Sequence, residues 1–178
     1  MIINDYFEFD NNELFKTLKN YIKTNPCCKQ FPNCNHPLYQ SDPNLFDIKD
    51  NNIKIIKNNY FSCLLKLFNK NELNIIENKV WTYLTLKNEN TQSKWHKHIE
   101  INNNNINISG LLYVTETNIG TEFKTEFLNF EIIPHINRWF LWDSSIIHRP
   151  KNMISKEDRI VIATATILKN DISDNNFR

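Results

Sequence analysis

The sequence predicts a mainly β (α+β) domain in which two antiparallel sheets pack face to face, as in a jelly-roll or cupin-type fold, with N-terminal helices packed on one sheet. Three observations support this prediction. Apolar residues recur at helical spacing near the N-terminus, and after Lys79 the pattern changes to the alternation typical of strands. About eight short strands follow, separated by turn residues. Helices gathered before a run of strands are typical of this architecture.

Residues 1–79 are expected to form helices and a loop. Apolar residues at helical spacing in residues 11–22 predict an amphipathic helix with an Asn cap. A second helix is expected over residues 60–68 and a third, short one over residues 71–78. The proline-rich stretch between the first two helices predicts an irregular loop.

Residues 80–168 are expected to form the β core, followed by a polar tail at 169–178. Alternating apolar residues, many of them aromatic or β-branched, indicate each strand. The predicted strands are residues 80–86, 95–101, 108–115, 121–123, 127–133, 138–142, 146–149 and 159–168. No repeat or linker divides the chain, so we expect a single domain over residues 1–178.

Composition excludes several classes of protein. The formal net charge is +1 at pH 7, so nothing in the charge balance favours nucleic acid or an anionic membrane as a partner. No apolar run approaches the roughly 20 residues that cross a bilayer. The N-terminus lacks the basic and apolar regions of a secretory signal. We therefore expect a cytoplasmic protein that is a monomer or a weak dimer.

Three of the four cysteines lie close together in the proline-rich loop. Cys27, Cys28 and Cys34 are followed by His36, and together they offer four zinc ligands. However, adjacent cysteines do not match the Cys-x2-4-Cys spacing of most zinc sites. Free or packed thiols are the alternative. Cys63 lies in an apolar stretch and is expected to be a core residue.

The candidate metal ligands come from two places in the β core. Side chains alternate along a strand, so His96, His98 and Glu100 are expected on one face of the strand at 95–101. His148 follows in a later strand, and Arg159 opens the last one. Two imidazoles and one carboxylate form the facial triad of non-haem Fe(II) oxygenases. An arginine suits the carboxylate of a 2-oxoacid, because its planar fork forms two parallel hydrogen bonds.

Several short motifs, in this order, resemble the core of the 2-oxoglutarate/Fe(II)-dependent dioxygenases, and most closely their prolyl-hydroxylase-like branch. The motifs lie at residues 95–98, 109–114, 120–123, 137–144, 148–150 and 158–160. The resemblance covers about residues 81–168. It implies a double-stranded β-helix that uses Fe(II), 2-oxoglutarate and O2. The implied reaction hydroxylates a peptidyl or small-molecule substrate with release of succinate and CO2.

The resemblance also implies roles for individual residues. His98, Glu100 and His148 would bind iron, and Arg159 with Tyr113 would bind the distal carboxylate of the cosubstrate. The usual acidic ligand in the family is Asp, so a set of three histidines that includes His96 is the alternative. We favour the set with Glu100, because a carboxylate lowers the charge of the ferrous site and suits oxygen chemistry. In that case His96 would contact substrate or a ligand.

Trp142, Asp143 and Arg149 lie close to the candidate ligands in the sequence or the expected sheet, and two other classes of protein remain as alternatives. Trp142 is a candidate for the substrate pocket or the core, and Asp143 either supports a ligand histidine or caps the turn before His148. Arg149 is expected to point away from the metal. The other classes are a cupin-type metal enzyme with three histidines and no 2-oxoglutarate, and a non-catalytic β-sandwich binding protein.

Overall fold

The computed structural model describes residues 2–3, 6–27, 39–91, 93–98 and 105–170. Its helices are α1 (Asn11–Thr24), the short 3-10 helix η2 (Leu45–Asp47) and α2 (Asn51–Phe68). Its strands are β1 (Ile2–Ile3), β2 (Ile75–Thr85), β3 (Asn105–Tyr113), β4 (Thr121–Lys124), β5 (Asn129–Ile132), β6 (Trp139–Asp143), β7 (Ile147–Pro150) and β8 (Arg159–Lys169).

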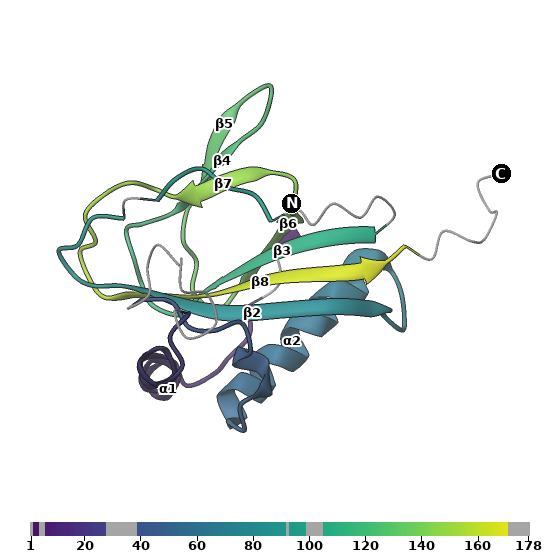
Figure 1. The fold of residues 1–178 in the computed structure, drawn as a ribbon, viewed down its shortest axis with the longest axis horizontal. Helices are drawn as coiled ribbons and strands as arrows, with labels where there is room; N and C mark the ends of the chain where they lie inside the picture. Colours follow the sequence, from purple (N-terminus) through teal and green to yellow (C-terminus); the bar gives the residue numbers. More distant parts are fainter. Residues whose placement is uncertain (1, 4–5, 28–38, 92, 99–104, 171–178) are drawn as a thin grey trace.

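The strands form two antiparallel sheets that lie one above the other (Figure 1). The larger sheet has the order β1-β6-β3-β8-β2, and the smaller has the order β5-β4-β7. Helices α1 and α2 cover the outer face of the larger sheet, so its inner face is turned toward the smaller sheet. The predicted mainly β double-sheet fold, with helices packed on one sheet, is confirmed.

Helix α1 packs against the larger sheet through the apolar face that the sequence predicts. Its buried residues are Leu14, Leu18, Tyr21 and Ile22. The predicted Asn cap is wrong, because Asp10 is the N-cap and its carboxylate accepts the Glu13 N–H at 3.0 Å. The Asn11 side chain donates to the Val114 carbonyl oxygen instead, at 2.9 Å. That bond joins the start of α1 to the β core.

Helix α2 begins nine residues before the predicted start at residue 60. Asp50 is its N-cap and accepts hydrogen bonds from the N–H groups of Asn52 and Ile53 at 2.8 and 3.1 Å. Ile53 and Ile56 are buried and continue the helical spacing of Tyr60. Asn and Lys residues on the solvent side conceal this apolar stripe in the sequence.

The prediction of a short helix at residues 71–78 is wrong. Helix α2 ends at Phe68, and its C-cap Asn69 has a left-handed conformation with φ of 49°. Strand β2 already begins at Ile75, which pairs with Leu168 of β8. Long-range pairing with β8 therefore overrides the local helical pattern of this segment.

Strands β3 and β6 are buried on both faces and contribute to two apolar clusters. Residues such as Leu112 and Trp139 pack toward the helices. The alternate residues pack between the two sheets: Leu111, Tyr113, Phe140 and Trp142, with Phe123 of β4 and Val161 of β8. Alternation along each strand therefore separates the helix-side core from the layer that contains the candidate site.

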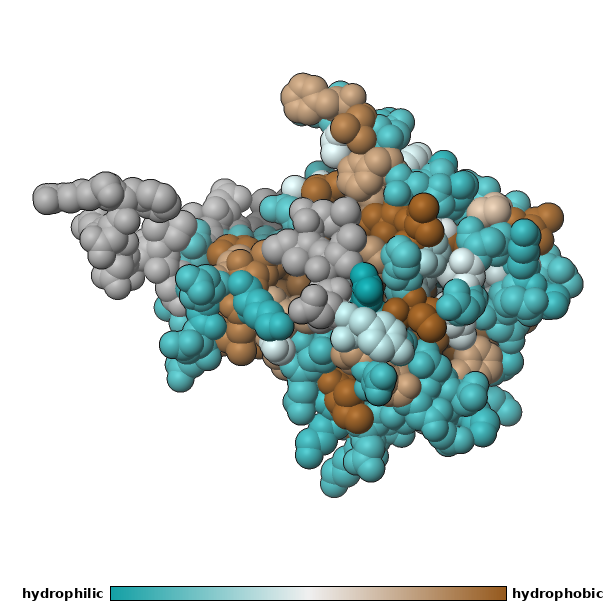
Figure 2. Space-filling view, turned by 180° about the vertical axis from the view of Figure 1, so that it is seen from behind, coloured by the Kyte–Doolittle hydropathy of each residue, from teal (hydrophilic) through white to brown (hydrophobic). Residues whose placement is uncertain are grey.

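Strands β4 and β5 form a hairpin of the smaller sheet that projects from the body of the molecule, and Figure 2 shows its apolar tip. Phe127 is 91% exposed and Leu128 is 56% exposed. The strand predicted over residues 127–133 is accordingly shorter, because its first two residues belong to the tip. Ile133, just after β5, is also exposed.

Two of the four cysteines, Cys27 and Cys63, lie among the described residues. Cys27 and Cys63 are buried, which confirms Cys63 as a core residue. Cys28, Cys34 and His36 lie outside the described residues, so the zinc site stays a prediction. In the parts of the chain that the structure describes, no helix combines the length and hydropathy needed to cross a membrane.

Candidate active site

A cavity of about 530 Å³ lies between the two sheets. Its lining includes residues from the larger sheet, from β7, and from the segment 93–98 before β3. Among them are three histidines and a buried arginine: His96, His98, His148 and Arg159. Titratable groups that converge in a cavity lined largely by apolar and aromatic residues are typical of an active site.

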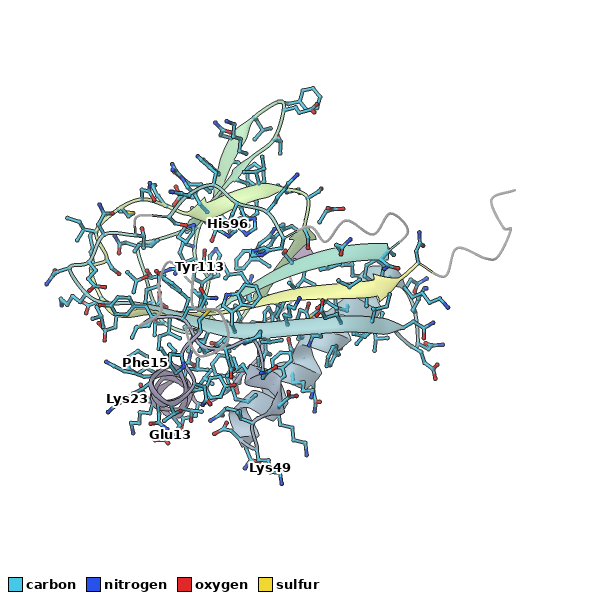
Figure 3. The ribbon with its side chains drawn as sticks, viewed as in Figure 1. Glu13, Phe15, Lys23, Lys49, His96 and Tyr113 are labelled. Atoms are coloured by element: carbon cyan, nitrogen blue, oxygen red, sulfur yellow. The ribbon has the colours of Figure 1, made fainter. Side chains whose placement is uncertain are left out.

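The three histidines form a cluster on the side of the smaller sheet. His148 lies in β7, and His96 pairs with it through two backbone hydrogen bonds of 3.0 and 2.9 Å. The His98 N–H donates to the Ser144 carbonyl oxygen at 3.2 Å. One ring nitrogen from each histidine lies within 4.8 Å of the others, so one metal ion can contact all three. His96 points into the space between the sheets (Figure 3).

Backbone carbonyls orient two of these rings. Nδ1 of His96 lies 3.0 Å from the Lys94 carbonyl oxygen, and Nδ1 of His148 lies 3.0 Å from that of Ile146. A carbonyl oxygen can only accept, so each Nδ1 carries a proton, and in the neutral ring Nε2 has the electron pair that can bind a metal. Metal-binding histidines are commonly oriented in this way.

The buried histidines are neutral at physiological pH. Burial, reinforced by the neighbouring His148 and His96 rings, lowers the pKa of His98 to about 3. Burial also lowers the pKa of His148 to about 4, although the Ile146 carbonyl opposes the change. Neutral imidazole is the form that binds metal, so the lowered pKa values of His98 and His148 favour metal binding by these two rings.

Two of the three predicted metal ligands lie in the histidine cluster. His98 and His148 are brought together as expected, and His96 joins them. Glu100 lies outside the described residues, so the ligand set with Glu100 stays a prediction. The strand predicted over residues 95–101 is present only as the isolated pairing at His96, and residues 99–101 are likewise outside the described part.

Arg159 is buried in the larger sheet, at the first residue of β8. It is 1% exposed, and among the described residues its Nε and Nη1 have no hydrogen-bond partner. Its guanidinium lies 5.6 Å from the centre of the Tyr113 ring. The Tyr113 hydroxyl is 2.7 Å from Thr121 Oγ1. A buried cation therefore lines the cavity that also contains the histidines.

Burial and charge act on both members of this pair. Burial lowers the pKa of Arg159, while Tyr113 opposes that effect, and an arginine nevertheless keeps its charge in proteins. Burial raises the pKa of Tyr113, and the nearby Arg159 opposes the increase. The result is a neutral phenol beside a permanent positive charge, which together suit a carboxylate ligand.

Trp142, Asp143 and Arg149 have separate environments. Trp142 lines the cavity, and its ring centre lies 5.0 Å from that of His148. Asp143 is exposed and accepts the Ser145 N–H at 2.8 Å, so it caps the turn before His148. Arg149 contacts Glu122 and the Trp95 ring, as expected for a side chain on the opposite face from His148.

Several residues that line the cavity were not predicted from the sequence. Trp81 and Tyr83 of β2 and Ala163 of β8 belong to this group, with Ser109 and Thr121. Alternation from Arg159 places Ala163 on the cavity face of β8, and that signal was available in the sequence. The β2 residues depend on the β2–β8 register, which no local pattern specifies.

Comparison of sequences finds no matching family model and no matching curated protein. Comparison of structures finds similar folds. A Pseudomonas putida prolyl-4-hydroxylase matches with a TM-score of 0.62 and 9% identity, over 95% of this chain and 91% of that chain. The chain has the double-stranded β-helix fold of the prolyl hydroxylases.

Two further prolyl hydroxylases share this fold, and each was solved with a ligand. A Trichoplax adhaerens prolyl hydroxylase in complex with a peptide fragment of the hypoxia inducible factor oxygen degradation domain matches with a TM-score of 0.56 and 13% identity, over 95% of this chain and 83% of that chain. The viral collagen prolyl hydroxylase of Paramecium bursaria Chlorella virus-1, in complex with 2-oxoglutarate, matches with a TM-score of 0.53 and 12% identity, over 94% of each chain.

Proposed function

We propose that this protein is an Fe(II)- and 2-oxoglutarate-dependent oxygenase that hydroxylates a peptidyl or small-molecule substrate. A histidine cluster of metal-binding geometry and a buried arginine line the same cavity, which supports the proposal. The shared prolyl-hydroxylase fold is consistent with it. A peptide complex and a 2-oxoglutarate complex among the structural neighbours suggest these two ligand classes.

The observation that carries the proposal is the environment of Arg159. A buried charge without a partner is unfavourable, and among the described residues Nε and Nη1 of this side chain have no acceptor. The planar guanidinium fork matches the two oxygens of a carboxylate. A carboxylate ligand in the cavity would therefore supply the missing partner, and 2-oxoglutarate has one at the end distant from its keto group.

For the metal we propose His96, His98 and His148 as ligands. Imidazole nitrogen suits ferrous iron among other first-row metals. Three neutral imidazoles leave both charges of a divalent ion uncompensated, so a dianionic cosubstrate is the complementary ligand. Glu100 is the alternative third ligand, as favoured from the sequence alone.

When bound, iron and 2-oxoglutarate supply the oxidising chemistry, in which O2 is consumed, succinate and CO2 are released and a substrate C–H bond is hydroxylated. The residues of the chain would position these groups. Arg159 and Tyr113 would hold the distal carboxylate, and the histidines would hold the metal. Phe123 and Trp142 pack beside the His148 ring and limit the access of water to it.

A second candidate function is favoured by the histidine cluster itself. Sites with three histidines and an open position also occur in cupin-type metal enzymes that use no 2-oxoglutarate. Such an enzyme would bind metal at the same cluster and would leave Arg159 without a carboxylate. The two candidates therefore differ in whether 2-oxoglutarate binds and whether Arg159 is needed for that binding.

The test is a 2-oxoglutarate titration of anaerobically purified, iron-loaded protein, with succinate formation and iron content measured on the same samples. Loss of one partner of a buried charge pair typically costs about 2–5 kcal/mol of binding. We expect Arg159→Gln to raise the apparent 2-oxoglutarate constant roughly thirtyfold or more, at about 1.4 kcal/mol per decade. Iron content should stay near that of the parent.

Two controls sharpen this test. 2-Oxobutyrate lacks the distal carboxylate, so the parent and Arg159→Gln should bind it with similar affinity. Arg138 is exposed and lies outside the cavity lining, so Arg138→Gln should bind 2-oxoglutarate like the parent. Failure of the iron-loaded parent to bind 2-oxoglutarate would overturn the proposal in favour of the second candidate.

A further inference from the structure

The segment that carries His96 and His98 is held in place by a small number of backbone hydrogen bonds. His96 exchanges two with His148 of β7, and the His98 N–H donates one to Ser144 in the turn before β7. The positions of these two imidazoles therefore depend on how firmly the segment is attached to β7.

A row of three side chains crosses the outer face of the smaller sheet at this attachment. Because His96 and His148 pair in antiparallel register, their neighbours Trp95 and Arg149 lie opposite each other on the other face. Arg149 in turn pairs with Glu122 of β4. We call these three residues the Trp95–Arg149–Glu122 row.

Arg149 contacts both of its neighbours in the row. Its guanidinium carbon lies 4.3 Å from the centre of the Trp95 ring, a cation–π arrangement. Its Nε donates to Glu122 Oε2 at 2.8 Å, and the two side chains are only 24% and 26% exposed. The ion pair restrains the guanidinium, and the contact with the guanidinium restrains the indole ring.

The row lies directly behind the histidine cluster. Trp95 precedes His96 and Arg149 follows His148, so alternation places the histidines on the cavity side and the row on the outer side. We infer that Arg149 is a positioning residue for the metal centre, which holds the His96–His98 segment against β7 through Trp95. This inference rests on the proposed metal-binding function of the histidines.

The test measures the affinity for Co(II) alone, by the visible absorption of the cobalt complex, in the parent and in single and double variants. Loss of groups that orient metal ligands typically lowers metal affinity by about 10–100-fold. We expect Arg149→Ala and Trp95→Ala each to weaken Co(II) binding about tenfold and to change the cobalt spectrum. The double variant should lose little more than either single variant, because each substitution breaks the same contact.

Conservative and matched variants separate positioning from loss of stability. Trp95→Phe keeps an aromatic face and should restore most of the affinity, whereas Arg149→Lys loses the planar fork and should restore less. Lys151→Ala removes the 2.6 Å ion pair with Glu131, which also involves the smaller sheet but does not touch the ligand segment. It should leave Co(II) affinity within about twofold of the parent.

The outcomes also separate this inference from the proposed function. Failure of the parent to bind Co(II) would overturn the metal site and this inference with it. If the parent binds Co(II) and the Co(II) affinity of Arg149→Ala and Trp95→Ala is unchanged, the metal site stands and the positioning role of Arg149 is overturned. Strictly additive losses of Co(II) affinity in the double variant would have the same consequence. An equal loss of Co(II) affinity in Lys151→Ala would also overturn the positioning role of Arg149, because any disturbance of the smaller sheet would then weaken metal binding.

Discussion

At the scale of single residues, the identity of the third metal ligand sets the charge of the site. His96 and Glu100 both lie two positions from His98, so an extended chain places both on its face. A third imidazole leaves a divalent ion with its full charge, whereas a carboxylate removes one unit. The convergence of His96 with the other two histidines supports the first arrangement.

This choice leads to a prediction for iron content. His96→Ala should weaken iron binding by roughly a hundredfold or more, since loss of a ligand exceeds the 10–100-fold typical of residues behind the ligands. Glu100→Gln should retain iron, because in this arrangement the carboxylate is not a ligand. The measurement is iron per chain after anaerobic dialysis against a weak chelator. Iron loss in Glu100→Gln with retention in His96→Ala would restore the set favoured from the sequence.

Local patterns in the sequence could predict some residues of the candidate site and not others. Alternation placed His96 and His98 on one face, and an isolated cation opening an apolar strand identified Arg159. The sequence favoured Glu100 over His96 as the third ligand. The pairing of His96 with His148 has no local signal, because it joins residues far apart in the chain. The same pairing creates the contact between Trp95 and Arg149, for which no local signal exists.

At the scale of elements, the start of α2 illustrates how a cap determines a helix boundary. Asp50 satisfies two N–H groups at the first turn, and its other carboxylate oxygen accepts the Thr17 hydroxyl of α1 at 3.3 Å. The cap thus also joins the two helices that cover the larger sheet. Polar residues on the solvent face concealed this boundary in the sequence, whereas the buried apolar stripe identified the helix itself.

The cap can be tested by a stability measurement. Asp50→Ala should lower the free energy of unfolding by about 1 kcal/mol, the usual loss for an N-cap. For a chain of this length that corresponds to a Tm about 2–4 °C lower. Asp50→Asn should stay near the parent, since asparagine caps equally well. Asp47→Ala, at an exposed carboxylate that is not the N-cap of a helix, is the matched control. Equal effects of Asp50→Ala and Asp50→Asn would contradict the prediction.

At the scale of the whole molecule, the change from helical to alternating periodicity was sufficient to predict the double sheet. The register between strands was not predictable, because a strand displaced by two residues keeps the same faces. Register decides which residues surround Arg159: the antiparallel pairing of β8 with β2 sets Thr85 opposite it. The cavity is therefore a property of the assembled sheets.

Because the cavity exists only in the folded chain, its ligands should stabilise the fold by mass action. For the metal-loaded parent, 2-oxoglutarate at a hundredfold its Kd should add about 2.7 kcal/mol, or roughly 5–10 °C in Tm. At the same concentration Arg159→Gln, with about thirtyfold weaker binding, should gain only about 1 kcal/mol. Arg138→Gln should keep the full shift in a thermal unfolding scan. An equal shift in the parent and Arg159→Gln would contradict a role for Arg159 in binding.

The candidate ligand groups are divided between the two layers: the histidines belong to the smaller sheet and its attached segment, and Arg159 with Tyr113 belongs to the larger sheet. Under the proposed function, one cosubstrate molecule would touch both layers, with the metal at one end and the arginine at the other. Linkage then requires the metal to increase the affinity for the cosubstrate by the same factor as the cosubstrate increases the affinity for the metal. The cell's supply of a small dicarboxylate would thus govern how firmly the protein retains its iron.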